Sequence, residues 1–157
     1  MEGFFADAQA VSTADSDRIV YEVDRHQPAA EGTEGALYFG ITHIHPGDIG
    51  GEFHMTKGHF HANGSRAEYY WGIHGRGVLL LMSRDGETRA EEVRPGSLHY
   101  IPGDLGHRLV NTGDTSLDVG ACWPADAGYD YGSIAERGFG LRVMRGPDGP
   151  RLLAVQR

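Results

Sequence analysis

The sequence has little cysteine, no run of basic residues and no long hydrophobic stretch, and each lack excludes a class of protein. Its single cysteine, Cys122, excludes an internal disulfide and a zinc site built from several cysteines. Lys and Arg number 14 against 22 Asp and Glu, giving a net charge of −8, which is unfavourable for binding nucleic acid or an anionic membrane. No window approaches the roughly 18 apolar residues of a membrane-spanning helix.

The start of the chain also lacks the positive segment and apolar run of a signal peptide, so we expect a cytoplasmic protein. A length of 157 residues predicts one domain, 1–157, because no stretch has the composition of a domain linker. Within it, residues 1–17 are expected to form an N-terminal segment with one short helix, packed on or beside the main body.

Glycine and histidine are plentiful, with 24 and 9 residues. Many of the glycines stand beside Pro, Asp or Asn in turn signals that separate short β-rich runs. Roughly ten strands at this spacing predict an all-β sandwich or barrel, with a second short helix over Ser133–Arg137. The expected strands are Arg18–Val23, Ala36–Ile44, Glu52–His61, Glu68–His74, Gly77–Ser83, Thr88–Val93, Leu98–Ile101, Arg108–Asn111, Leu117–Trp123, Leu141–Arg145 and Leu152–Val155.

Four of the potential metal ligands have a regular arrangement in the sequence. His59 and His61 are two residues apart, so on a strand they project from the same face. Glu68 follows seven residues after His61, across a loop that can turn it back toward the histidines. His107 comes later, directly after another turn. Three imidazoles and one carboxylate suit a first-row divalent ion, with two octahedral positions left for substrate oxygens.

A bare His-x-His pair is weak evidence, because packed or exposed histidines are commoner than metal ligands. The full pattern is more specific, and with Pro102 and Asn111 around His107 it resembles the two cupin signatures. The cupin fold is a double-stranded β-helix, a jelly-roll-like barrel with its ligands in the mouth. The resemblance therefore implies the same all-β class as the turn pattern, with a short N-terminal extension.

A closer resemblance is carried by Thr56–His61, the run TKGHFH, which is similar to the cupin-type phosphoglucose isomerases of archaea. It continues over most of the chain, through Arg66–Tyr70, His107–Asp114 and Pro124–Gly132. It implies interconversion of glucose 6-phosphate and fructose 6-phosphate, in glycolysis or gluconeogenesis, by a metal-dependent aldose–ketose isomerase. It also implies Fe(II) as the natural metal, with Zn, Ni or Mn able to occupy the site.

Roles follow from this resemblance position by position. The implied metal ligands are His59, His61, Glu68 and His107. The implied catalytic residues are Glu68 and Tyr131, and the implied substrate and phosphate contacts are Tyr21, Thr42, Thr56, Gly58, Tyr70 and Trp123. Either Lys57 or Arg66 is a candidate for balancing the phosphate charge.

Two positions depart from the family pattern. Trp123 stands where the family usually has tyrosine, and Tyr129 where it usually has histidine. The first change leaves a donor-only N–H in place of a hydroxyl, and the second removes a group that titrates near neutral pH. We expect either a retuned isomerase or a different sugar phosphate.

Several alternatives stay open from the sequence. The chain could be an isomerase or epimerase of another sugar phosphate, a cupin Fe(II) dioxygenase, or a sugar-binding cupin without catalysis. For the isomerase, Glu68 could carry a proton between carbons, or a hydride could shift directly. The expected partners are a small-molecule sugar phosphate and a second copy of the chain in a homodimer, without nucleic acid or membrane.

Overall fold

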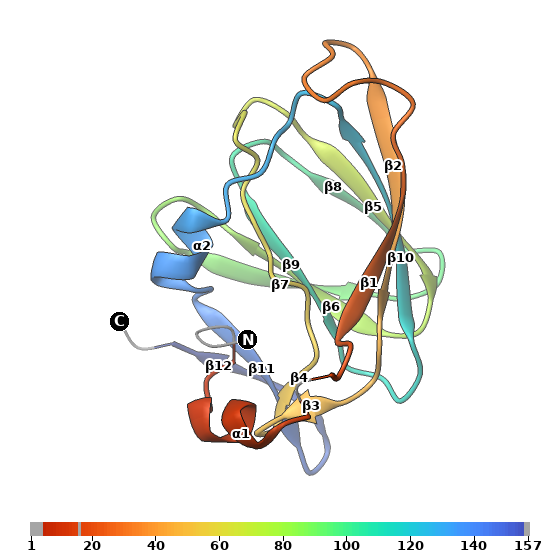
Figure 1. Ribbon diagram of the computed structural model, residues 1–157. Coiled ribbons are helices and arrows are strands. Elements are labelled where there is room, and N and C mark those ends of the chain that lie inside the picture. The colour runs from red at the N-terminus through yellow and green to blue at the C-terminus, as the bar shows by residue number, and fades with distance from the viewer. Residues whose placement is uncertain (1–4, 16, 156–157) are drawn as a thin grey trace.

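Short strands joined by tight turns form three antiparallel sheets in the computed structural model, which describes residues 5–15 and 17–155 (Figure 1). The largest has the order β1 (Tyr21–His26), β2 (Leu37–Ile44), β10 (Leu117–Pro124), β5 (Glu68–His74), β8 (Leu98–Ile101). A second has the order β7 (Thr88–Val93), β6 (Gly77–Met82), β9 (Gly106–Asn111). The third has the order β12 (Gly149–Ala154), β11 (Leu141–Gly146), β4 (Glu52–Phe53), β3 (Asp48–Ile49). The predicted all-β class is confirmed.

The burial of β6 explains why its sequence, GVLLLM, is apolar rather than alternating. Leu79 and Leu81 pack with residues of the five-stranded sheet such as Leu117 and Val119. Val78, Leu80 and Met82 face the opposite way and pack with apolar side chains that include Phe53, Phe60 and Phe139. Both faces of this strand are therefore in a core, whereas β5 buries one face and leaves the other partly exposed.

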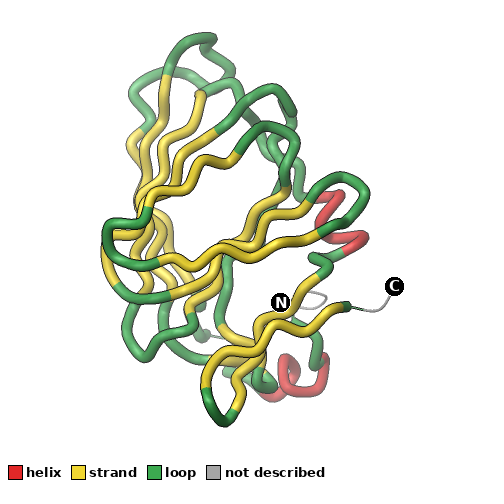
Figure 2. The backbone as a smooth tube through the Cα atoms, turned by 180° about the vertical axis from the view of Figure 1, so that it is seen from behind, coloured by secondary structure: helices red, strands yellow, loops and turns green. Residues whose placement is uncertain are grey.

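Two short helices lie outside the strands, as Figure 2 shows. The side chain of Asp7 caps α1 (Ala8–Thr13) by accepting a hydrogen bond from the Ala10 amide, 2.9 Å long. Helix α2 (Gly132–Arg137) lies where the sequence predicts it. Of the expected N-terminal segment, residues 1–4 and 16 lie outside the described residues. No helix in the described part of the chain is long and apolar enough to cross a membrane.

One expected strand, Glu52–His61, is wrong in its extent. Only Glu52–Phe53 forms a strand, and the rest of the segment makes single bridges, including one between His59 and His107 of β9. The physical reason is Gly58, whose φ of +72° interrupts the extended backbone. The short strand β3 is not among the expected strands.

Candidate metal and substrate site

The residues singled out from the sequence gather around one cavity. The empty space between its walls is about 680 Å³, including its open mouth. Strands β1, β2, β5, β9 and β10, the segment 56–61 and the segment that follows β10 supply its wall. The lining includes every implied site residue: Tyr21, Thr42, Thr56, Gly58, His59, His61, Glu68, Tyr70, His107, Trp123 and Tyr131.

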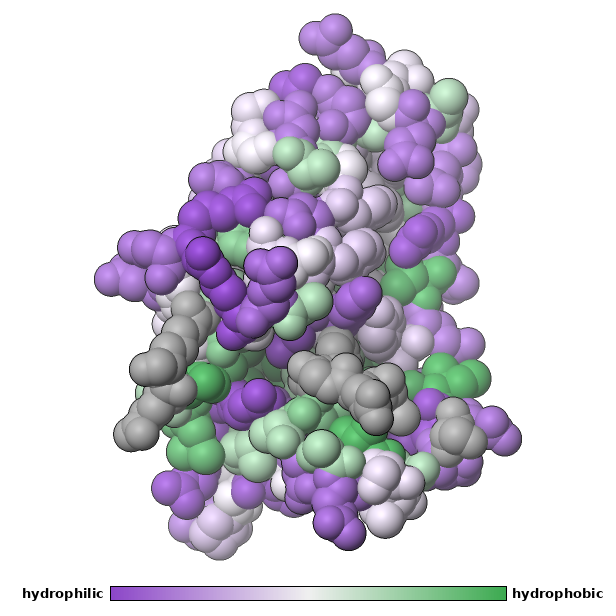
Figure 3. Space-filling view, turned by 60° about the vertical axis from the view of Figure 1, so that its left-hand side comes forward, coloured by the Kyte–Doolittle hydropathy of each residue, from purple (hydrophilic) through white to green (hydrophobic). Residues whose placement is uncertain are grey.

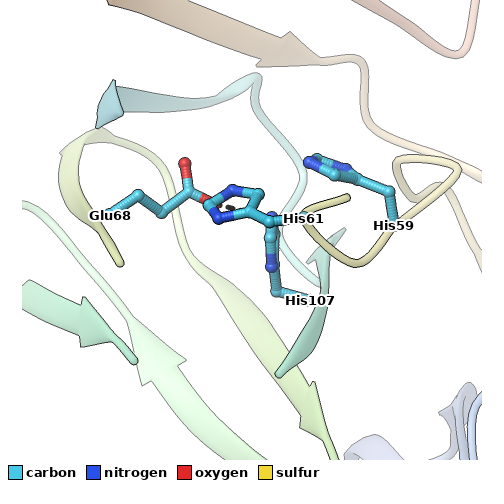
Figure 4. A group of neighbouring side chains, drawn as sticks. All are labelled: His59, His61, Glu68 and His107. Carbon is cyan, nitrogen blue, oxygen red and sulfur yellow. Dashed lines mark ion pairs between the residues drawn. The ribbon is translucent and has the colours of Figure 1, made fainter. Parts of the chain in front are cut away.

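At one side of this cavity the four proposed metal ligands converge (Figure 4). One potential ligand atom from each of His59, His61, Glu68 and His107 lies within 4.8 Å of the others. Oε1 of Glu68 is 2.6 Å from Nε2 of His107 and 3.4 Å from Nε2 of His61. Among the described residues this is the one group of histidine, cysteine or acidic side chains close enough to hold a metal ion.

Backbone carbonyls orient two of the imidazoles. Nδ1 of His61 donates to the carbonyl oxygen of Arg66 at 2.7 Å, and Nδ1 of His107 donates to that of Leu105 at 3.1 Å. With the proton held on Nδ1, each ring turns the lone pair of Nε2 toward the centre of the group. This is the usual arrangement of metal-binding histidines.

The protonation states of Glu68 and His59 also suit a cation. Burial alone would raise the pKa of Glu68, but the neighbouring His107 and His61 outweigh burial and lower this pKa to about 2. Burial lowers the pKa of His59 to about 3, and the adjacent His107 acts in the same direction. Glu68 is therefore an anion and His59 a neutral imidazole at neutral pH, which are the forms that bind metals.

Buried polar atoms at the centre of the group show whether these residues could hold a metal ion. Nε2 of His61, Oε1 of Glu68 and Nε2 of His107 are buried, and none has a hydrogen bond of regular geometry. Such groups are costly to bury unless something satisfies them. A divalent ion at their centre would bind all three, so the residues present fit a metal.

Gly58 lies in the segment that leads into His59 and His61 of the proposed metal site. A Cβ atom at Gly58 would lie 2.8 Å from Cε2 of Phe139 and 3.0 Å from the carbonyl oxygen of His107. Together with the positive φ, this close approach requires glycine. The segment can then lie against β9 and bring His59 and His61 next to His107.

Replacing Gly58 by alanine is expected to destabilise the fold by about 2–3 kcal/mol, from the positive φ and the contact with Phe139. Urea unfolding would measure this loss. Gly35→Ala is the matched control, because Gly35 has a φ of +79° with nothing within 4 Å. It should cost only the backbone part, about 1 kcal/mol. Equal losses in the two variants would contradict the importance of the close approach.

An aromatic wall borders the metal ligands at the two departures from the family pattern. Tyr129 and Tyr131 are stacked with ring centroids 5.8 Å apart, and His59 lies 5.0 Å from Tyr129 and 5.4 Å from Tyr131. Trp123 lies beside the Tyr129 hydroxyl, where its indole N–H opposes the rise that burial causes in the pKa of Tyr129. Trp123 and Tyr129, the two residues that depart from the family pattern, are thus neighbours in the aromatic wall.

The predicted phosphate contacts lie on neighbouring segments. Oγ1 of Thr56 accepts a hydrogen bond from the Leu109 amide at 3.1 Å, and its hydroxyl proton is left to donate elsewhere. Thr42 faces the cavity from the middle of β2. Lys57 also lines the cavity, with Nζ 4.6 Å from the centre of the Tyr131 ring.

Arg66 does not serve as the cation that the sequence suggested. It forms a two-pronged ion pair with Asp126, with N···O distances of 2.6–3.0 Å, and it is not part of the cavity lining. Its guanidinium is thus already neutralised. The sequence places both residues in segments that carry the resemblance but gives no sign that they pair across 60 positions.

One charged residue of the lining, Arg25, is absent from the sequence expectations. The expected strand ended at Val23, but β1 continues to His26. With the strand extended, the alternation from Tyr21 through Val23 places Arg25 on the same inward face. The alternation of inward and outward residues along a strand was the signal that could have identified Arg25. The acidic and polar residues around Arg25 hid that alternation.

Solved structures of low sequence identity share the fold. Oxalate oxidase bound to the substrate analogue glycolate matches with a TM-score of 0.58 and 14% identity, over 85% of this chain and 66% of that one. A mutant oxalate decarboxylase from Bacillus subtilis matches with a TM-score of 0.54 and 21% identity, over 76% and 30% of the chains. The predicted cupin barrel is thereby confirmed.

Sequence comparisons identify the family. The model of the glucose-6-phosphate isomerase (GPI) family matches residues 1–151. The glucose-6-phosphate isomerase of Thermococcus litoralis is 45% identical over 146 residues, covering 92% of this chain and 76% of the relative. A putative glucose-6-phosphate isomerase 2 of Rhizobium meliloti is 43% identical, covering 91% and 72%. The chain belongs to the cupin-type glucose-6-phosphate isomerase family.

Proposed function

We propose that this protein is a metal-dependent isomerase that interconverts glucose 6-phosphate and fructose 6-phosphate. The observation that carries the proposal is the cavity itself. It joins a largely buried group of three histidines and one glutamate to a wall of hydroxyl groups and cations, in a chain 45% identical to named isomerases of this activity.

The proposed division of the cavity follows from the chemistry of its walls. His59, His61, Glu68 and His107 would hold a divalent ion, which supplies Lewis-acid polarisation of the sugar carbonyl and stabilises negative charge on the sugar oxygens. At some distance from that ion, the hydroxyls of Thr42 and Thr56 and the amide of Gly58 would bind the phosphate. The open-chain sugar then spans the cavity with its first two carbons near Glu68.

Glu68 is the proposed carrier of the proton between the two carbons. Its carboxylate is buried and ionised, so water does not compete for its negative charge. Tyr70 lies beside it, and burial raises the pKa of the Tyr70 phenol well above its usual value, so this hydroxyl stays a hydrogen-bond donor. We propose that the hydroxyl of Tyr131, at the aromatic wall, donates to the sugar during the transfer.

Among metals, Fe(II) is the proposed natural ion, with Zn, Ni or Mn as possible substitutes. Imidazole and carboxylate donors suit all of these ions, so the donor set selects the class of metal and not the element.

The test is an assay of the purified protein with fructose 6-phosphate, in which glucose 6-phosphate is measured after loading with Fe(II), Mn(II) or Zn(II). We expect turnover with at least one of these ions. Absence of glucose 6-phosphate with every ion would contradict the proposed activity. Oxygen uptake or product formation of another kind would instead favour one of the alternative cupin functions.

We also propose that the chain forms a homodimer in the cytoplasm, as one domain over 1–157. The face brought forward in Figure 3 is mainly hydrophilic. In contrast, the outer face of the five-stranded sheet, together with its edge strand β8, exposes apolar side chains. These are Leu37, Phe39, Tyr69, Ile73, Leu98 and Tyr100. An exposed apolar edge of this kind is usually covered by another chain.

Leu98→Lys is expected to convert the dimer into monomers at micromolar concentration, because it places a charge on the most exposed of these side chains, 66% accessible. Sedimentation velocity would show the shift. The matched control is Leu152→Lys, which changes a 49% exposed leucine on β12, outside this sheet. The control should remain dimeric, and a wild-type monomer would contradict the proposed pairing.

A further inference from the structure

Arg25 faces the cavity but has no part in the function proposed so far. It lies on the inward face of β1, where it pairs in the antiparallel register with Gly40, while Val23 pairs with Thr42. Arg25 and Thr42 are thus diagonal neighbours on adjacent strands. Such neighbours are about 7–8 Å apart, within reach of a long side chain. A guanidinium at Arg25 can therefore reach a group bound at Thr42.

The wall next to Arg25 is shaped by an aromatic ring. A Cβ atom at Gly40 would lie 3.1 Å from Cη2 of Trp123 and 2.8 Å from the carbonyl oxygen of Asp24. The indole therefore occupies the space that a side chain on β2 would take. Arg25, Gly40 and Trp123 form one continuous part of the lining.

The cavity that Arg25 lines extends from His59 among the metal ligands to Tyr129 and Tyr131 on the aromatic wall. An anion bound in this cavity would be attracted by the positive charge of Arg25.

The other cations near the cavity are engaged. Arg66 is paired with Asp126, and Arg108 is buried, where it donates to the carbonyl oxygen of Lys57 at 2.8 Å. Lys57 itself lies over the ring of Tyr131. Within residues 5–15 and 17–155, Arg25 forms no ion pair with a side-chain carboxylate. It is the lining cation with the least competition for its charge.

We propose that Arg25 binds the phosphate group of the substrate and makes the cavity select phosphorylated sugars over neutral ones. This inference rests on the proposed function only in taking a sugar phosphate as the substrate. A guanidinium offers two parallel N–H donors to phosphate oxygens, whereas the threonine hydroxyls and the Gly58 amide are neutral donors. In a chain with a net charge of −8, a local cation also opposes the repulsion of an anionic ligand.

The test compares Arg25→Met and Arg25→Lys with the wild-type metal-loaded protein. Two quantities are measured: kcat and KM for fructose 6-phosphate, and the Kd of inorganic phosphate by calorimetry. Arg89→Met is the matched control, because Arg89 lies on β7 and outside the cavity lining. We expect Arg25→Met to raise both KM and Kd about tenfold with kcat changed less than twofold, since this fold-change corresponds to the loss of one hydrogen bond to a charged group.

Arg25→Lys should recover part of the loss, because it keeps the charge but not the two-pronged geometry. Arg89→Met should match the wild type in KM and Kd. Unchanged KM and Kd in Arg25→Met, or a loss confined to kcat, would overturn the inference. If the wild type does not isomerise the sugar but Arg25→Met still weakens phosphate binding, the proposed function fails and the role of Arg25 stands.

Discussion

Glu68→Gln is expected to lower kcat for fructose 6-phosphate by about 10³-fold. The amide keeps the size of the side chain but can neither take up the proton nor carry the negative charge, and general-base catalysis contributes about 10²–10⁴-fold. The pKa of Glu68, lowered to about 2 by His107 and His61 against the effect of burial, keeps the native carboxylate ionised at neutral pH. Steady-state kinetics of the metal-loaded variant would measure the loss.

The matched control for this prediction is Glu52→Gln. Glu52 is also buried, 2% exposed, but it pairs with Arg142 and accepts a hydrogen bond from the Ala6 amide, away from the cavity. This variant should lose stability and keep its kcat at low temperature. Equal losses of kcat in the two variants would show that burying an amide, and not the loss of the base, is responsible.

Turnover in deuterated water distinguishes proton transfer by Glu68 from a direct hydride shift. If Glu68 carries the proton, turnover in D₂O should place deuterium at the carbon that receives it, to the extent that the carboxyl exchanges with solvent. A product free of deuterium, together with a kcat in Glu68→Gln close to that of the wild type, would contradict proton transfer by Glu68 and favour a direct hydride shift.

His107→Ala is expected to abolish metal binding at micromolar concentration and to lower activity at least a hundredfold. His107 contacts Glu68 at 2.6 Å and lies within 4.4 Å of His59 by ring centroids, so its loss removes a central donor of the group. Mutating a residue that only orients a metal ligand already lowers metal affinity 10–100-fold. Metal content by mass spectrometry of the purified protein would measure the effect.

His99→Ala provides the control for loss of a buried histidine. His99 is 7% exposed, and Nδ1 of its ring is 2.9 Å from Glu91, outside the cavity. This variant should retain its metal and its activity below its melting temperature. A thermal shift on adding metal is a second readout, because an ion that binds only the folded state raises Tm. We expect that shift in His99→Ala and not in His107→Ala.

Much of the strand pattern was predictable because glycine, proline and aspartate mark its turns. The sequence spacing of His59, His61, Glu68 and His107 also anticipated that these side chains would meet. The segment before His59 was not predictable as a strand or a loop, since only the three-dimensional approach of Phe139 shows why Gly58 must take a positive φ.

The cations were the least predictable part of the site. Arg66 and Asp126 pair across 60 positions, which no local pattern indicates, and this removes Arg66 from the phosphate-binding candidates. Arg25 lies where β1 continues beyond its apolar residues. Only the pairing of Arg25 with Gly40 in the sheet shows that this side chain lies on the inward face. The contact between Trp123 and Tyr129 likewise depends on how the loop after β10 folds back.

Under the proposed function, a single ion held by the three histidines and Glu68 is required for sugar-phosphate isomerisation. The most direct measurement removes bound metal with a chelator and titrates Fe(II) back while following conversion of fructose 6-phosphate to glucose 6-phosphate. We expect no activity at the start and a linear rise that saturates at one ion per chain. Full activity in the chelated protein, with metal content below a tenth of an ion per chain, would contradict it.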